Sequence, residues 1–155
     1  MKIRKIALTL VLCLTAVAGC YAADNPNMGT WKMNEAKSMI PAGLPKNTTV
    51  VYAAAGDQVK VTTDGTAADG KPFQTEWTGN FDGKDYPLSG DPSANTRSYK
   101  KINDRTLELT NKKDGKVTTT GRITISADGK TRMLKVNGTG PDGKKFSYSA
   151  VYDKQ

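Results

Sequence analysis

The tripeptide Asp-Gly-Lys occurs five times in this chain of 155 residues, and it is the feature that most limits how the chain can fold. Asp-Gly supplies the positive φ angles that a tight hairpin turn requires. Such turns make consecutive strands neighbours, so the repeats predict an antiparallel meander, in which Asp82-Gly83, for example, turns the strand 73–81 into residues 84–88. The repeats begin at Asp69, Asp82, Asp114, Asp128 and Asp142.

The segments between these turns alternate in polarity with a period of two, as half-buried strands do. The clearest case is the segment 73–81, where one face carries Phe73, Thr75, Trp77, Gly79 and Phe81. About ten short strands are expected on this pattern, which is typical of an all-β sandwich or barrel. They cover residues 29–33, 48–55, 58–66, 73–81, 84–88, 96–102, 106–111, 117–126, 131–139 and 146–152.

A meander leaves two exposed edges unless its first and last strands pair with each other. We therefore predict an all-β fold, an antiparallel up-and-down β-barrel of about 8–10 strands, rather than a sandwich. One short helical turn is expected near the N-terminus within residues 34–40, with Asn34 as its N-cap and Pro41 preventing its continuation.

The predicted interior is poor in bulky side chains. Leu, Ile, Val and Phe make up nineteen of the 132 residues after residue 23, below the roughly 20% at which disorder becomes plausible. The consistent alternation and turn chemistry argue against disorder and favour a barrel whose inner face mixes bulky and small groups. Such an interior can contain a cavity. One strand is expected to align Val117, Thr119, Gly121, Ile123 and Ile125 on a single face.

The first 22 residues have the pattern of a signal peptide, with a basic start and an apolar run over residues 6–18. Two cleavage sites fit. The sequence Val17-Ala18-Gly19-Cys20 resembles a bacterial lipobox, in which cleavage before Cys20 accompanies its lipidation. Cleavage after Ala22 would instead release a soluble protein. We expect an extracytoplasmic protein with one domain over residues 24–155, lipid-anchored in the periplasm or outer membrane, or alternatively secreted.

The residue inventory argues against an enzyme. The chain has no histidine, and both cysteines, Cys13 and Cys20, lie in the leader, so a disulfide in the mature chain is not expected. Glu76 and Glu108 alternate away from the apolar faces and are expected to point to solvent. The G-x-G-x-x-G match over residues 138–143 lacks the following helix of a dinucleotide site and fits a turn. No cofactor, metal or nucleic acid is expected.

The segment Gly29-Thr30-Trp31 resembles the G-x-W opening of the lipocalin and calycin barrels. With the predicted meander and the leader, the chain is similar to a small bacterial secreted lipocalin-like family. The resemblance implies that Trp31 closes the base of the barrel and that an arginine, Arg122 or Arg132, stacks on it. The family's T-D-Y motif has only Asp85-Tyr86 as a partial counterpart.

The aromatic side chains of the predicted inner face are the candidates for a binding site. They can serve as core packing alone or can also line a pocket, since ligand pockets are mostly apolar with a few polar groups. We predict a monomeric barrel that binds a small hydrophobic or amphipathic ligand. The alternative is a structural or interaction module of the cell envelope with a solid core. The candidate ligand-binding residues are Trp31, Phe73, Trp77, Phe81 and Tyr148.

Overall fold

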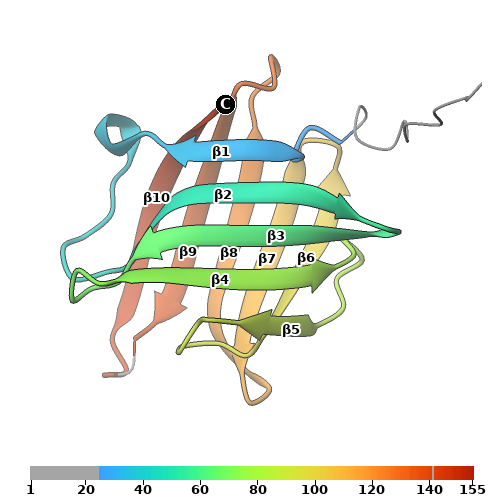
Figure 1. Ribbon diagram of the computed structural model, residues 1–155. Coiled ribbons are helices and arrows are strands. Elements are labelled where there is room, and N and C mark those ends of the chain that lie inside the picture. Colours follow the sequence, from blue (N-terminus) through green and yellow to red (C-terminus); the bar gives the residue numbers. More distant parts are fainter. Residues whose placement is uncertain (1–24, 141) are drawn as a thin grey trace, which may run out of the picture.

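A computed structural model describes residues 25–140 and 142–155, and the predicted leader lies outside these residues. Ten antiparallel strands close into a barrel in which each strand pairs with its neighbours in sequence (Figure 1). The predicted all-β up-and-down barrel is thus confirmed. The strands are β1 Gly29–Met33, β2 Lys46–Ala55, β3 Gln58–Thr66, β4 Pro72–Gly79, β5 Tyr86–Ser89, β6 Thr96–Asn103, β7 Thr106–Lys113, β8 Lys116–Ile125, β9 Thr131–Thr139 and β10 Lys145–Lys154.

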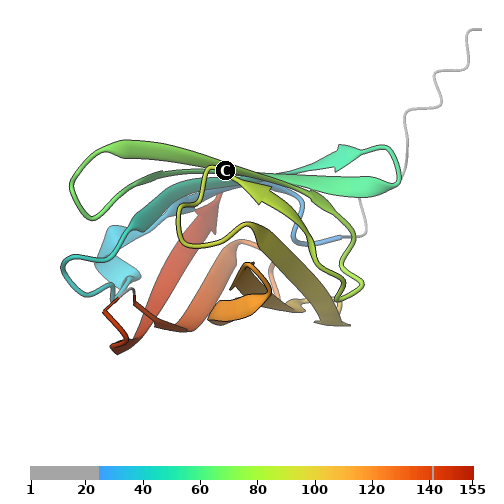
Figure 2. The ribbon, with the colours of Figure 1, turned by 90° about the horizontal axis from the view of Figure 1, so that it is seen from below.

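The first and last strands close the barrel, as the argument from exposed edges predicted. Trp31 pairs with Lys154, and Met33 pairs with Tyr152, while the opposite side of β1 pairs with β2. Strands β1 to β4 cross in front of β6 to β10 at a steep angle, so the barrel consists of two curved layers with the core between them (Figures 1 and 2).

The short strand β5 makes the barrel thinly paired on one side. It forms two residue pairs with β4 and two with β6. The prediction that Asp82-Gly83 makes a tight hairpin turn into the next strand was wrong. Instead this segment reaches to β6, where Gly83 N–H donates to the carbonyl of Tyr99 at 2.8 Å. A longer loop forms here because its backbone groups find partners on β6.

The other four Asp-Gly-Lys repeats form the predicted turns. Glycines in the second position have φ of 70–84°, and at Asp114 the aspartate also has a positive φ, of 50°. In four of the five repeats, Asp82 included, the aspartate carboxylate accepts a hydrogen bond from the backbone N–H of the lysine two residues later, at 3.0 or 3.1 Å. The aspartate therefore mimics a backbone acceptor and fixes the chain reversal.

A β-bulge breaks the alignment predicted for β8. Asn111 pairs with Thr119, but the next residue, Lys112, pairs with Val117, so Thr118 is an extra residue on this strand. Because a one-residue shift reverses which side chains face inward, Val117 is 56% exposed while Ile123 and Ile125 are buried. The prediction that Val117 shares their face was wrong.

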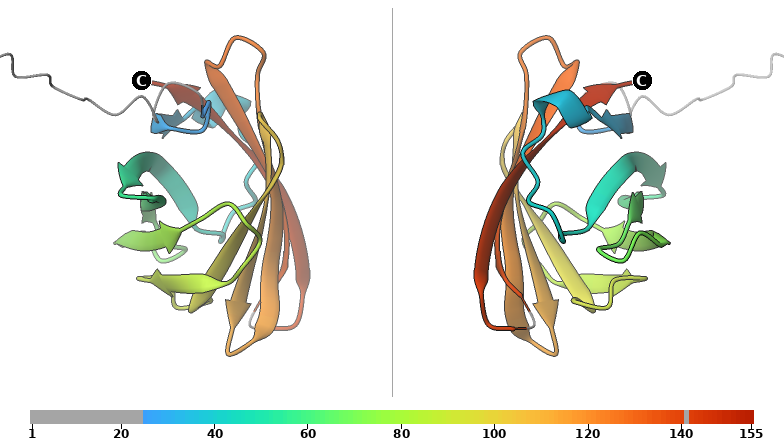
Figure 3. Two further views of the ribbon diagram at one scale, coloured as in Figure 1. Left: turned by 90° about the vertical axis from the view of Figure 1, so that its right-hand side faces the viewer. Right: turned by 90° about the vertical axis from the view of Figure 1, so that its left-hand side faces the viewer.

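A single 3-10 turn, η1 (Glu35–Lys37), follows β1, and the side chain of Asn34 caps it as predicted. The chain then crosses the side of the barrel between β10 and β2 before it enters β2 (Figure 3). Met39 holds this crossing to β10 through two backbone hydrogen bonds with Ser149, of 2.8 and 3.1 Å. The crossing segment, residues 38–45, covers the gap that remains where β1 ends before its neighbours do.

Replacing Gly129 with Val tests the turn assignment. The φ of Gly129 is 70°, and a Cβ atom there would meet nothing within 4 Å, so the cost is purely one of backbone conformation. We expect a loss of about 1–2 kcal/mol in the free energy of unfolding, measured by urea denaturation. Gly129→Asn is the matched control and should lose less, since Asn tolerates this conformation. An unchanged midpoint for Gly129→Val would contradict the assignment.

Candidate functional site

Trp31, which the family resemblance singled out, lies in the barrel core. Its side chain is fully buried, and its Nε1 donates to the carbonyl of Asn27 at 2.8 Å. The cation over its ring is the Nζ of Lys154, at 5.1 Å from the ring centroid. The prediction of Arg122 or Arg132 in this role was therefore wrong. Arg122 pairs with Glu108 on the outer face, and Arg132 lies inside the barrel against other rings.

An aromatic cluster fills the part of the barrel next to Trp77. The Trp77 ring stacks on Phe81 at 6.3 Å and meets the edges of Tyr86 and Tyr99 at 5.7 and 4.8 Å. Its Nε1 donates to the backbone carbonyl of Arg97 at 2.8 Å, which links β4 to β6 past the short β5. Trp77 and Phe81 are thus held in mutual packing and do not border the internal cavity described below.

Two phenylalanines cover glycines on neighbouring strands. Phe73 pairs across the sheet with Gly65, and Phe146 pairs with Gly138. A Cβ atom at Gly65 or Gly138 would come within 2.5 Å of the facing ring. The glycines are therefore required so that the rings can lie flat on the sheet. Phe73 has this packing role and does not border the cavity.

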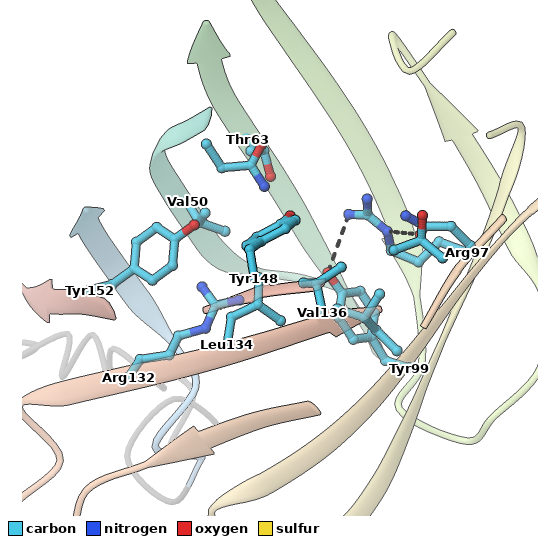
Figure 4. A pocket seen from close by; sticks show the side chains of 13 residues that line it. Val50, Thr63, Arg97, Tyr99, Arg132, Leu134, Val136, Tyr148 and Tyr152 are labelled. Atoms are coloured by element: carbon cyan, nitrogen blue, oxygen red, sulfur yellow. Dashed lines mark hydrogen bonds between the residues drawn. The ribbon is translucent and has the colours of Figure 1, made fainter. Parts of the chain in front are cut away.

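A cavity of about 50 Å³ lies in the barrel interior, beyond the aromatic cluster (Figure 4). Of the five predicted binding residues, Tyr148 lines it, and Trp31, Phe73, Trp77 and Phe81 do not. This volume holds a few water molecules, at roughly 10–15 Å³ each. The wall combines apolar, amide, hydroxyl and guanidinium groups, from Asn47, Val50, Thr63, Arg97, Tyr99, Leu109, Asn111, Thr119, Arg132, Leu134, Val136, Tyr148 and Tyr152.

An open groove of about 590 Å³ lies on the outside of the same region. It runs between residues 39–41 of the crossing segment and strands β9 and β10. Tyr148 and Val136 line both this groove and the internal cavity. These two side chains therefore lie where the interior comes nearest to the groove.

Arg132 is the most unusual residue of the cavity wall. Its side chain is only 2% exposed, and its guanidinium lies 5.1 Å from the ring centroids of both Tyr52 and Tyr152. Its Nη2 donates to the hydroxyl of Tyr52 at 2.9 Å, while Nε and Nη1 have no hydrogen-bond partner among the described residues. The two rings hold the guanidinium in place by cation–π contacts and leave two nitrogens available.

Arg97 is the second guanidinium of the wall. Its Nε donates to the Oδ1 of Asn111 at 2.7 Å, and its Nη1 reaches the hydroxyl of Tyr99 at 3.4 Å (Figure 4). Neither interaction supplies a negative charge. The side chain comes from β6, whose backbone Trp77 holds by the hydrogen bond described above.

Neither cation forms a salt bridge within the part of the chain that the structure describes, although the carboxylate of Asp91 acts electrostatically on Arg97. The salt bridges found there join other residues, and none includes Arg97 or Arg132. The neighbouring phenols remain protonated at neutral pH, because burial raises the pKa of Tyr152 to about 12 and raises the pKa of Tyr52 above its ordinary value. Arg132 is thus a buried positive charge without a paired anion, an arrangement that disfavours an empty, dry interior, whereas Arg97 is only half-buried.

The alternation of side chains along the sequence already places Arg132 on the inner face, although Arg132 was not predicted as a binding residue. Arg132 is in phase with Leu134 and Val136 on β9, so the period of two places all three on the inner face. A charged residue in phase with a buried face is uncommon and indicates a functional role when it has no partner. Arg97 has the same relation to Tyr99 on β6.

The two strand glutamates face outward, as predicted. Glu76 pairs with Lys60 at 2.9 Å, and Glu108 pairs with Arg122. Over residues 25–140 and 142–155, no group of three or more His, Cys, Asp or Glu side chains is placed to hold a metal ion. In the same residues, no helix has the length and apolar character needed to cross a membrane.

Comparison with known proteins assigns no family. No family model matches the chain, and no curated protein matches it. A solved structure that is similar is described as a redesigned beta barrel, mFAP1, bound to DFHBI. It is 17% identical, with a TM-score of 0.47, and the match covers 86% of this chain and 99% of that one.

The raised pKa of Tyr152 predicts a loss of stability at high pH. Below the unfolded-state pKa of about 10 the phenol is neutral in both states and costs nothing. Between about pH 10 and 12 the unfolded state ionises first, so the free energy of unfolding falls as pH rises. Tyr152→Phe should make this fall shallower in urea denaturation at pH 9 to 11. An identical slope for both proteins would contradict the burial argument.

Proposed function

We propose that the chain is a binding barrel that takes the anionic group of a small amphipathic molecule, a carboxylate above all, at Arg132. One observation carries the proposal: a buried guanidinium borders a cavity and has two nitrogens without a partner. Leaving a charge buried and uncompensated costs several kcal/mol. A bound anion removes that cost, whereas a purely hydrophobic ligand would increase it.

The geometry of the guanidinium favours a carboxylate. Each Nη nitrogen of arginine carries two hydrogens, so Nη2 of Arg132 has one left after its bond to Tyr52. That N–H lies beside an N–H of Nε or Nη1, neither of which has a partner, and the two N–H groups together can donate to both oxygens of one carboxylate. Arginine binds carboxylates through such parallel pairs of N–H groups, and the rings of Tyr52 and Tyr152 fix the plane in which they point.

The size and lining of the cavity limit the rest of the ligand. Pockets for drug-sized molecules enclose roughly 300–1,000 Å³, and this cavity encloses about 50 Å³. Side chains such as Val50, Leu134 and Val136 offer contact for a short apolar portion. These features support an acid of a few carbon atoms and narrow the predicted hydrophobic or amphipathic ligand to a small amphipathic one.

The small volume of the cavity also supports the alternative, a structural or interaction module with a solid core. Most of the interior is indeed filled by packed side chains, above all around Trp77. That alternative gives no account of a buried arginine with free donors, which a solid core would exclude. We therefore place the binding barrel first and propose no enzymatic activity for it.

We also propose that the protein is exported, as a lipocalin-like protein of a bacterial envelope. The support comes from the leader pattern of residues 1–22 and from the G-x-W segment. Mass spectrometry of the purified N-terminal peptide tests this. A diacylated Cys20 or a free Ala23 would support export, and a chain that retains Met1 would contradict it.

Arg132→Met tests the proposed site in the full chain. We expect sodium butyrate to raise the melting temperature of the wild type relative to sodium chloride at equal ionic strength. A ligand at 100 times its dissociation constant adds about 2.7 kcal/mol of stability. Arg132→Met should show no such rise and should be at least as stable as the ligand-free wild type, because a methionine there leaves no buried charge.

The exposed Arg122 provides the matched control, since it lies on the outer face. Arg122→Met removes the same charge and should keep the full response to butyrate. Equal responses of the wild type and Arg132→Met, or no response of the wild type to short carboxylates, would contradict the proposed function.

A further inference from the structure

Two guanidinium groups border the cavity, whereas the binding of one carboxylate requires only one of them. Arg132 and Arg97 border the same cavity but extend from different strands, β9 and β6. Each donates a hydrogen bond to a different tyrosine: Arg132 to the hydroxyl of Tyr52, and Arg97 to that of Tyr99. The rings of these two tyrosines meet edge to face, with their centroids 6.3 Å apart, so each guanidinium contacts one member of an aromatic pair.

The two groups also differ in depth and in partners. Arg132 lies deep, between Tyr52 and Tyr152, with two nitrogens free. Arg97 lies close to the amide of Asn111, and its Nη2 makes no hydrogen bond to a described residue. In Figure 4 the guanidinium groups of Arg132 and Arg97 lie on either side of the Tyr148 side chain. A single small anion on Arg132 therefore leaves Arg97 without an ion-pair partner.

We propose that Arg97 forms a second anion subsite, so that the barrel prefers a short ligand with two acidic groups, such as a dicarboxylate, over a monocarboxylate of equal length. This inference rests on the proposed function of Arg132. One acidic group pairs with Arg132 and the other with Arg97, so that the buried guanidinium and the half-buried one each gain an anionic partner. The apolar side chains Leu134 and Val136, which line the same cavity, contact the carbon chain that connects the two groups.

A matched set of acids tests the second subsite. Sodium butyrate and succinate have four carbons each, and valerate and glutarate have five. We expect isothermal titration calorimetry at equal ionic strength to show that the better dicarboxylate binds at least about tenfold tighter than its monocarboxylate, the gain expected from one added charged hydrogen bond. Arg97→Gln should lower the affinity for each dicarboxylate to that for the matching monocarboxylate.

Two variants separate the subsites and control for lost charge. Arg132→Gln should abolish the binding of both classes of acid, whereas Arg122→Gln, on the outer face, should leave all affinities unchanged. The backbone carbonyl of Arg97 that accepts from Trp77 is retained in Arg97→Gln, so this variant should keep its fold, as checked by circular dichroism.

The outcomes distinguish this inference from the proposed function. If both classes of acid bind through Arg132 with equal affinity, the second subsite is wrong and the proposed function stands. If Arg97→Gln weakens both classes equally, Arg97 contacts the first acidic group and the second subsite is again wrong. If no acid binds the wild type, both proposals are wrong.

Discussion

The ladder between β1 and β10 is the interaction on which the interior of this barrel depends. Its register pairs Trp31 with Lys154 and Met33 with Tyr152, and in the next ladder Tyr152 pairs with Arg132. Since side chains alternate along a strand, a slip of β1 by one residue along β10 would turn Trp31 away from the face that Tyr152 and Arg132 share. Closing the sheet therefore does more than remove two exposed edges, because it also fixes which side chains of β1 face the interior.

The same barrel divides its interior into a packed part and a polar part. Trp77, Phe81, Tyr86 and Tyr99 fill the first, and Trp77 compensates for the short β5 through its hydrogen bond to the carbonyl of Arg97. That bond fixes the backbone from which the second guanidinium extends. Trp77, predicted as a ligand contact, does not line the cavity, and its hydrogen bond helps to position a residue of the cavity wall.

The architecture could be predicted from local chemistry because turns and alternation are local signals. The turn at Asp128-Gly129 is held by hydrogen bonds within residues 126–131, and Asn34 caps its short turn with its own side chain. The exposure of Val117 could not be predicted, because a bulge depends on how β7 and β8 pair and not on the residues of β8 alone. The position of the cavity could not be predicted for the same reason. It follows from how Trp77 packs against rings on β5 and β6, and the alternation of side chains does not reveal that packing. Arg132 was visible on the inner face of its strand, but its lack of a partner is a property of the assembled interior.

The ¹H–¹⁵N resonance of Arg132 Nε tests the central claim most directly, because this N–H has no partner among the described residues and borders the cavity. Titration with sodium butyrate should shift this resonance to lower field, as a hydrogen bond to a carboxylate forms, and should leave the Nε resonance of the outward-facing Arg122 in place. An Arg132 signal that stays unchanged while the protein becomes saturated with the acid would contradict the account.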